Sequence, residues 1–203
     1  MKKLQRQRDL HRYRVERTQK TARDPTTIEK ALNKRRDFER DWFRRYEDIL
    51  HKVSCGPTWL SQSHIRNAVS DIIRDGDGRD YKLIAYCIMS NHVLIVLRPF
   101  VNESELKECT SSGGKPIFVS KLPTMPVIMQ RIKGASARKA NLLLGRSGSF
   151  WEHESFDRYV RDYEELIRII RYTIRNPVKA RLVRHWKEWK GTYLSPDFSE
   201  TFL

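Results

Sequence analysis

The sequence lacks the features that mark membrane, secreted or disulfide-rich proteins. No run of 18 apolar residues occurs, so nothing predicts a transmembrane helix. Residues 1–6 have no apolar signal core, and we therefore expect a cytoplasmic protein. Three cysteines (Cys55, Cys87 and Cys109) are odd in number and show no CxxC spacing, which predicts reduced thiols in place of a disulfide framework or zinc site.

Acidic residues are also few beside the basic ones. The chain has 25 Asp and Glu against 40 Lys and Arg, and its formal net charge is +15. Such an excess indicates a polyanionic partner, and clustering of the basic residues among aromatics favours nucleic acid over a merely basic protein. With 203 residues, the chain has room for one domain and an extra arm.

Hydrophobic periodicity predicts a mixed α and β protein. Two closely spaced apolar runs, 81–89 and 92–97, predict an antiparallel hairpin. A further strand is predicted at 150–160, a loop at 101–124 and a short edge strand at 116–120. Helices are predicted at four places, which are 28–50, 63–75, 127–144, and from a cap at Asp162 to Asn176, where Pro177 should end the last one.

Two segments carry residues suited to phosphate chemistry. His92 begins a strand and shares one face with Leu94 and Val96, where two histidines about 7 Å apart could converge on a metal ion. A lone histidine there is more often structural. On the last predicted helix, Tyr172 could attack a phosphodiester, and Asn176, one turn later, could bind metal or orient phosphate. From the helix alone, an aromatic that shields the core edge is the favoured interpretation.

Five sequence blocks, which occur in a fixed order, shift the interpretation of Tyr172 from a structural to a catalytic role. Together they resemble the REP-associated tyrosine transposases, a branch of the single-tyrosine HUH transposases, and the likeness covers roughly residues 35–190. The last block, with Asn-Pro-Val-Lys-Ala at 176–180, is the most specific. The blocks are Gly-Pro-Thr-Trp-Leu at 56–60, Tyr-Cys-Ile-Met-Ser-Asn-His-Val at 86–93, Gln-Arg-Ile-Lys-Gly at 130–134, Phe-Trp-Glu-His-Glu-Ser-Phe-Asp at 150–157, and residues 172–183.

The resemblance implies an α+β fold, namely a ferredoxin-like antiparallel sheet with helices on one face, as in HUH nucleases. It divides the chain into a basic helical arm with the first long helix (1–50), a transposase-like catalytic domain (51–185) and an irregular tail (186–203). It implies a homodimer, associated with the nucleoid, that acts on single-stranded hairpin DNA of repeat elements in DNA transposition.

The same resemblance assigns roles to individual residues. Tyr172 would be the nucleophile that forms a 5′-phosphotyrosine link. His92 and Asn176 would be ligands of Mg²⁺ or Mn²⁺. Arg131, Lys133, Arg138 and Lys139 would contact phosphates, and Trp151 or Phe156 would stack on a base, although both aromatics fit a core role better.

The chain departs from the family pattern at two places. Leu94 stands where the second metal-binding histidine is expected, and His153 is the candidate replacement. Loss of a residue that supports a metal ligand lowers metal affinity or activity by ~10–100-fold, and loss of a ligand itself should cost at least as much. The first strand of the family is also missing, which indicates a truncated copy or a start placed too late. Two alternatives therefore stay open: a degenerate or domesticated copy that binds hairpin DNA without nicking it, and a basic RNA-binding protein.

Overall fold

The chain forms two compact units, Met1–Pro57 and Thr58–Leu203. The computed structural model describes residues 10–51 with gaps at 12, 16, 19–20 and 23, residues 56–100, and residues 123–202 with gaps at 154, 156 and 161. The predicted edge strand at 116–120 lies outside the described residues. No helix within these ranges is both long and apolar enough to cross a membrane.

The first unit contains one long helix, α2 (Pro25–His51). Proline suits the first helical position because its missing N–H would have no partner there. Asp24 precedes the helix and accepts hydrogen bonds from the backbone N–H groups of Thr26 (3.2 Å) and Thr27 (3.0 Å). Hydrogen bonds from the hydroxyls of these threonines, ahead of the backbone ones, lower the pKa of Asp24 to about 2. The predicted helix is therefore confirmed, three residues longer at its start.

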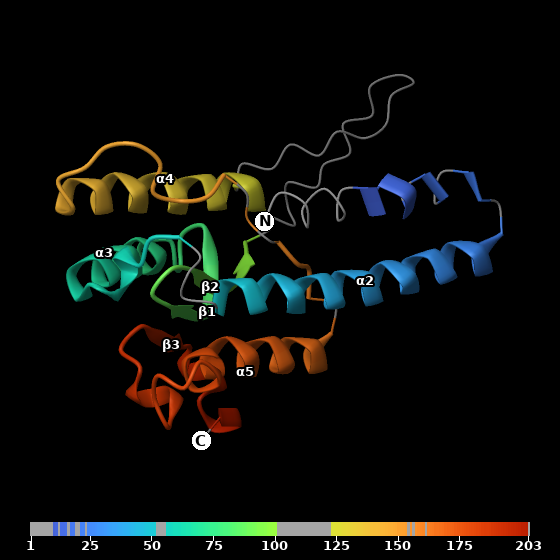
Figure 1. Ribbon diagram of the computed structural model, residues 1–203. Coiled ribbons are helices and arrows are strands. Elements are labelled where there is room, and N and C mark those ends of the chain that lie inside the picture. The colour runs from blue at the N-terminus through green and yellow to red at the C-terminus, as the bar shows by residue number, and fades with distance from the viewer. Residues whose placement is uncertain are drawn as a thin grey trace. The chain divides into compact units, whose positions relative to one another are not determined.

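The second unit is built around a three-stranded antiparallel sheet with the order β2-β1-β3 (Figure 1). The predicted hairpin is confirmed as β1 (Tyr81–Ile88) and β2 (Val93–Pro99), and the N–H of Met89 donates to the carbonyl of His92 (2.9 Å) across the turn. No strand precedes β1 among the described residues.

Helices cover both faces of this sheet. α3 (Ser63–Asp75) and α4 (Met125–Leu143) share an apolar cluster with one face, and α5 (Tyr163–Lys179) packs on the other (Figure 1). The prediction of helices on one face is therefore wrong. Every residue of β1 except Lys82 is buried, and a strand that is apolar on both sides must be covered on both sides.

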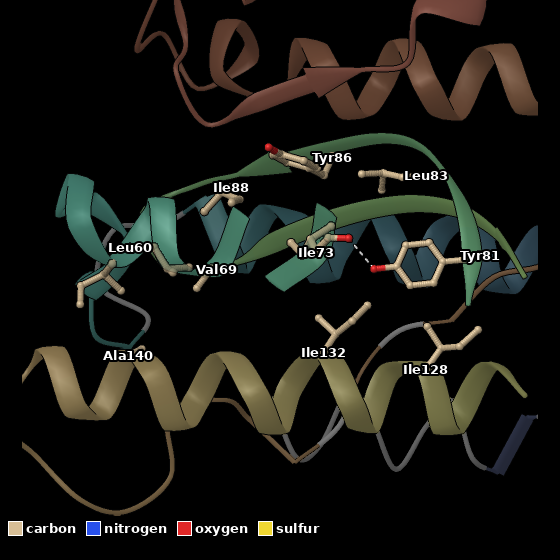
Figure 2. Packing of buried hydrophobic residues seen from close by; sticks show 11 residues of the cluster. Leu60, Val69, Ile73, Tyr81, Leu83, Tyr86, Ile88, Ile128, Ile132 and Ala140 are labelled. Atoms are coloured by element: carbon tan, nitrogen blue, oxygen red, sulfur yellow. Dashed lines mark hydrogen bonds between the residues drawn. The ribbon is translucent and has the colours of Figure 1, made fainter. Parts of the chain in front are cut away.

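The α3 face holds the larger cluster, which Figure 2 shows from close by. Ile128 and Ile132 point from α4 toward α3 and the strands, and the Tyr81 hydroxyl donates to the carbonyl of Ile73 (2.5 Å). Gly76 lies so close to the Tyr81 ring that a Cβ atom there would be 2.6 Å from it. A side chain larger than hydrogen would therefore displace the ring at the end of α3.

The C-terminal tail, predicted to be irregular, supplies the third strand. β3 (Thr192–Leu194) pairs antiparallel with β1. The N–H of Ile88 donates to the carbonyl of Gly191 (2.8 Å), and the Trp189 indole donates to the carbonyl of Ile88 (2.9 Å). A Cβ at Gly191 would lie 2.5 Å from that Ile88 oxygen, so the close approach requires glycine. Three residues are too few to show a strand's alternation in the sequence.

Two further predictions are corrected. The described residues of 150–160 form no strand. The Lys133 side chain of α4 bonds part of this backbone, since its ammonium donates to the carbonyls of Glu152 (2.6 Å) and His153 (3.0 Å). Pro177 does not end α5, which continues to Lys179. The ring costs one helical N–H, yet the carbonyl of Pro177 still accepts from the N–H of Leu182 (2.9 Å).

Candidate active site

Helix α5 positions the predicted nucleophile. Asp162 caps its start by accepting a hydrogen bond from the N–H of Glu165 (2.7 Å), which satisfies a donor that a helix leaves unpaired. Ile170 and Ile174 then pack on Ile84, Ala85 and Val96 of the sheet, and these contacts fix the rotation of the helix.

Tyr172 and Asn176 lie together one turn apart on this helix. The Asn176 amide Nδ2 donates to the Tyr172 hydroxyl oxygen (3.3 Å), and the Lys179 ammonium lies 5.4 Å from the centre of the Tyr172 ring. Tyr172 is half-buried, whereas Asn176 is fully buried at 0% exposure. The Lys179 contact with the ring is a cation–π interaction, which helps to hold the two side chains together.

The amide oxygen of Asn176 is, like Arg66 Nε on α3, a buried polar atom without a hydrogen-bond partner among the described residues. Oδ1 is buried and accepts no hydrogen bond from the described residues. Leaving such an acceptor unsatisfied costs about 1–3 kcal/mol, so its retention indicates a ligand or a functional constraint.

His92 lies in the turn just before β2, which begins at Val93 and not at His92 as predicted. Val96 of β2 packs in the α5 cluster, whereas Val93, Ile95 and Leu97 pack toward α3 and α4. Alternation along the strand therefore places Leu94 on the α5 side. His92 is outside the strand, so alternation does not assign its side chain to a face. His92 Nδ1 lies 2.8 Å from Asn91 Oδ1. An amide oxygen only accepts, so Nδ1 carries the proton and the lone pair of the neutral ring is on Nε2.

The described residues do not fit a complete metal site. The expected set has Asn176 Oδ1 and His92 as donors, and Leu94 adds none. The residues that the structure describes also contain no group of three His, Cys, Asp or Glu side chains that could hold a metal ion. His153 does not fill the place, because its segment lies against α4, where its carbonyl accepts from Lys133 (3.0 Å).

The predicted DNA-contacting residues gather on α4, away from Tyr172. Arg131 pairs with Asp80 (3.0 Å), and the Lys133 ammonium is bound to backbone carbonyls, where burial lowers its pKa. Arg138 and Lys139 are exposed. The half-buried Trp151 donates to the Ser136 hydroxyl (2.9 Å). Since α4 packs behind α3 on one face and α5 covers the other, the structure does not bring these side chains to the nucleophile. Phe156 lies outside the described residues.

Sequence reasoning missed Lys179 as part of the Tyr172 site. The signal was present, because residues seven apart lie on one side of a helix, but the predicted helix ended at Asn176. Comparison of the chain with models of protein families, with curated proteins and with solved structures gave no match.

Proposed function

We propose that the protein is a single-strand-specific DNA transposase of the single-tyrosine type, with Tyr172 as its nucleophile. The pairing of the Tyr172 hydroxyl with the buried, incompletely bonded amide of Asn176 carries this proposal. The net charge of +15 suits a polyanionic substrate, and the five sequence blocks supply the reaction class. Hairpin DNA of repeat elements is the proposed substrate, bound by a homodimer.

In the proposed reaction, the Tyr172 oxygen attacks the phosphorus of a scissile phosphodiester. The bond from phosphorus to the 3′ oxygen breaks, that oxygen takes up a proton, and the DNA stays attached to the protein through its 5′ phosphate. The energy of the broken ester is kept in the tyrosyl ester, so rejoining needs no further energy source. In this proposal the Lys179 ammonium, 5.4 Å from the centre of the Tyr172 ring, helps to hold the negatively charged phosphate beside the attacking oxygen.

A second candidate function is hairpin binding without strand cleavage. It is favoured by Leu94, which presents no lone pair on the α5 side of β2, and by the incomplete set of metal donors among the described residues. This candidate shares the substrate of the first and differs only in the absence of a covalent step.

Trapping of a covalent adduct tests the first function. Single-stranded DNA from the repeats flanking the gene, labelled at its 3′ end, is incubated with the protein and Mn²⁺ or EDTA. The proposal expects a labelled band of protein size that survives denaturation and is lost in Tyr172→Phe. The matched control is Tyr163→Phe on the same helix, since that tyrosine is 63% exposed and packs on nothing in the core.

The outcomes separate the candidates. An adduct that persists in Tyr172→Phe refutes the assignment of the nucleophile. Hairpin binding without an adduct, with an adduct gained in Leu94→His, supports the second function. Preference for an RNA hairpin of the same sequence over DNA contradicts both.

A further inference from the structure

After its first turn, helix α5 carries charges of one sign. Between residues 166 and 190 there are eight Lys or Arg and one Asp or Glu, and that one, Glu188, accepts a hydrogen bond from the N–H of Arg184 (3.1 Å). Three exposed cations lie within about 40° of one another around the helix axis, on the side away from the core. We call them the α5 cation row, and they are Arg168, Arg175 and Lys179.

The outward position of these side chains does not by itself explain their single charge sign. The exposed residues of α3, in the same unit, include both signs, as Asp71, Arg74 and Asp75 show. In α5 the carboxylates are confined to the first turn, where the helix dipole favours them. The dipole also favours Lys179 in the last turn, but it does not account for Arg168, which is in the N-terminal half of the helix.

Two members of the row have no role in the fold of the described residues. The side chains of Arg168 and Arg175 make no hydrogen bond, ion pair or ring contact there, and Glu164, one turn before Arg168, does not pair with it. Arg175 is also four residues from both Arg171 and Lys179, and like charges at this spacing destabilise a helix. A negatively charged partner from outside the chain would relieve this repulsion.

The turn that ends α5 adds a cation in a strained backbone conformation. Arg181 has φ 58°, and among the described residues it is the one non-glycine with a positive φ. Its N–H donates to the carbonyl of Val178 (2.9 Å), and that of Leu182 to the carbonyl of Pro177 (2.9 Å), which is a C-terminal cap where glycine is preferred. A Cβ atom is unfavourable in this conformation, so a requirement for the exposed arginine side chain explains the departure from glycine.

We infer that the α5 cation row and Arg181 hold the backbone of single-stranded DNA across the Tyr172 hydroxyl. Tyr172 stands within the row, since Arg168 is four residues before it and Arg175 three after it, and such residues are neighbours on a helix surface. The Lys179 ammonium is 5.4 Å from the centre of the Tyr172 ring.

The length of the row suits several phosphates. From Arg168 to Lys179 the helix rises about 16 Å. A stacked strand carries one phosphate per ~3.4 Å, so the row can meet about four in succession. The inference rests on the proposed function for its substrate class. It assigns the phosphate contacts beside the nucleophile to α5, whereas the family resemblance implies contacts from α4.

Removal of two charges that make no contact within the protein tests this inference. Arg168→Gln/Arg175→Gln leaves the core side of α5 intact, so Tm should not fall. Affinity for a fluorescent single strand of the repeat DNA is measured by anisotropy over a range of salt, in EDTA so that cleavage does not contribute. The slope of log affinity against log salt should become shallower by about 1.4, because each phosphate contact of a single strand contributes ~0.7. At ~0.1 M salt, affinity should fall at least tenfold.

Lys30→Gln/Lys34→Gln is the matched control. These two exposed lysines lie on one side of helix α2, and their replacement changes the net charge by the same amount. The slope and the affinity of this variant should equal those of the wild-type protein. Equal losses in the two double variants would show a general effect of charge and overturn the inference.

Arg181→Gly separates strain from binding. Glycine adopts the left-handed conformation freely, so Tm should rise by about 2–4 °C, while the salt slope becomes shallower by about 0.7. A higher Tm with an unchanged slope would exclude Arg181 from the DNA contact. An adduct at Tyr172 together with unchanged slopes in both α5 variants refutes the cation row alone, whereas shallower slopes without an adduct support the row and refute cleavage alone.

Discussion

The two faces of strand β1 differ in the polar groups that they bury. On the α3 face, the Tyr81 hydroxyl donates to a backbone carbonyl, and the Tyr86 hydroxyl lies 2.6 Å from the Ser70 hydroxyl and accepts from Arg74 (3.0 Å). On the α5 face, the apolar cluster is smaller and the buried Asn176 keeps an oxygen without a partner among the described residues. Arg66 Nε of α3 is also buried without a partner among the described residues, but the Asn176 oxygen belongs to an amide that bonds a tyrosine hydroxyl.

This difference indicates where function resides. A protein retains an unsatisfied buried group only where something outside the folding free energy maintains it. The Asn176 oxygen is one such group, and it belongs to the side chain that bonds the Tyr172 hydroxyl. Substitution of one buried residue on each face tests whether the two faces differ in this way.

The largest effect is expected on the α3 face. Ile73→Ala removes a fully buried side chain from the cluster and should lower the free energy of unfolding by about 3 kcal/mol, since truncated Ile and Leu side chains in cores cost 2–5 kcal/mol. Urea denaturation followed by circular dichroism measures it. Leu142→Ala, at a site 72% exposed, is the control and should change stability by less than about 0.5 kcal/mol. Similar losses in both variants would show that this face is not the core.

The second largest change in stability is expected on the α5 face, and it is an increase. Asn176→Leu replaces a buried amide of similar size, relieves an unsatisfied acceptor, and should raise the free energy of unfolding by about 1 kcal/mol. The same variant should form no covalent adduct with DNA. Thermal unfolding and the adduct assay are run on one preparation. A loss of 2 kcal/mol or more would show that Asn176 serves the fold, and the contrast between the faces would disappear.

The smallest effect at neutral pH concerns Tyr81. Burial, reinforced by the carboxylate of Asp77, raises its pKa to about 12 from the usual 10. The unfolded chain therefore loses this proton first, so the contribution to stability is complete below pH 10 and declines between pH 10 and 12. Absorbance at 295 nm should show one tyrosine that titrates near 12, and Tyr81→Phe should remove it. A Tyr81 that titrates near 10 would contradict its burial against α3.

Much of the architecture was predictable because it depends on local patterns. The helix 63–75 was predicted to the residue, since the acidic and glycine-rich turn at 75–78 marks its end. The segment 150–160 was not, because its backbone carbonyls at Glu152 and His153 bond to the Lys133 side chain of α4 and not to a neighbouring strand. For the candidate site, the sequence predicted Tyr172 and Asn176 on one helix ridge, but it could not place α4 and its basic residues on the other side of the sheet.

The sequence by itself determined the basic charge, the β1–β2 hairpin and the spacing of Tyr172 from Asn176, because net charge, strand alternation and helical period are properties of neighbouring residues. Tertiary structure decided which faces of β1 are covered, that the tail supplies β3, and that the Asn176 oxygen is buried without a partner among the residues that the structure describes. These features depend on contacts between segments distant in the chain, so they exist only once the core has formed.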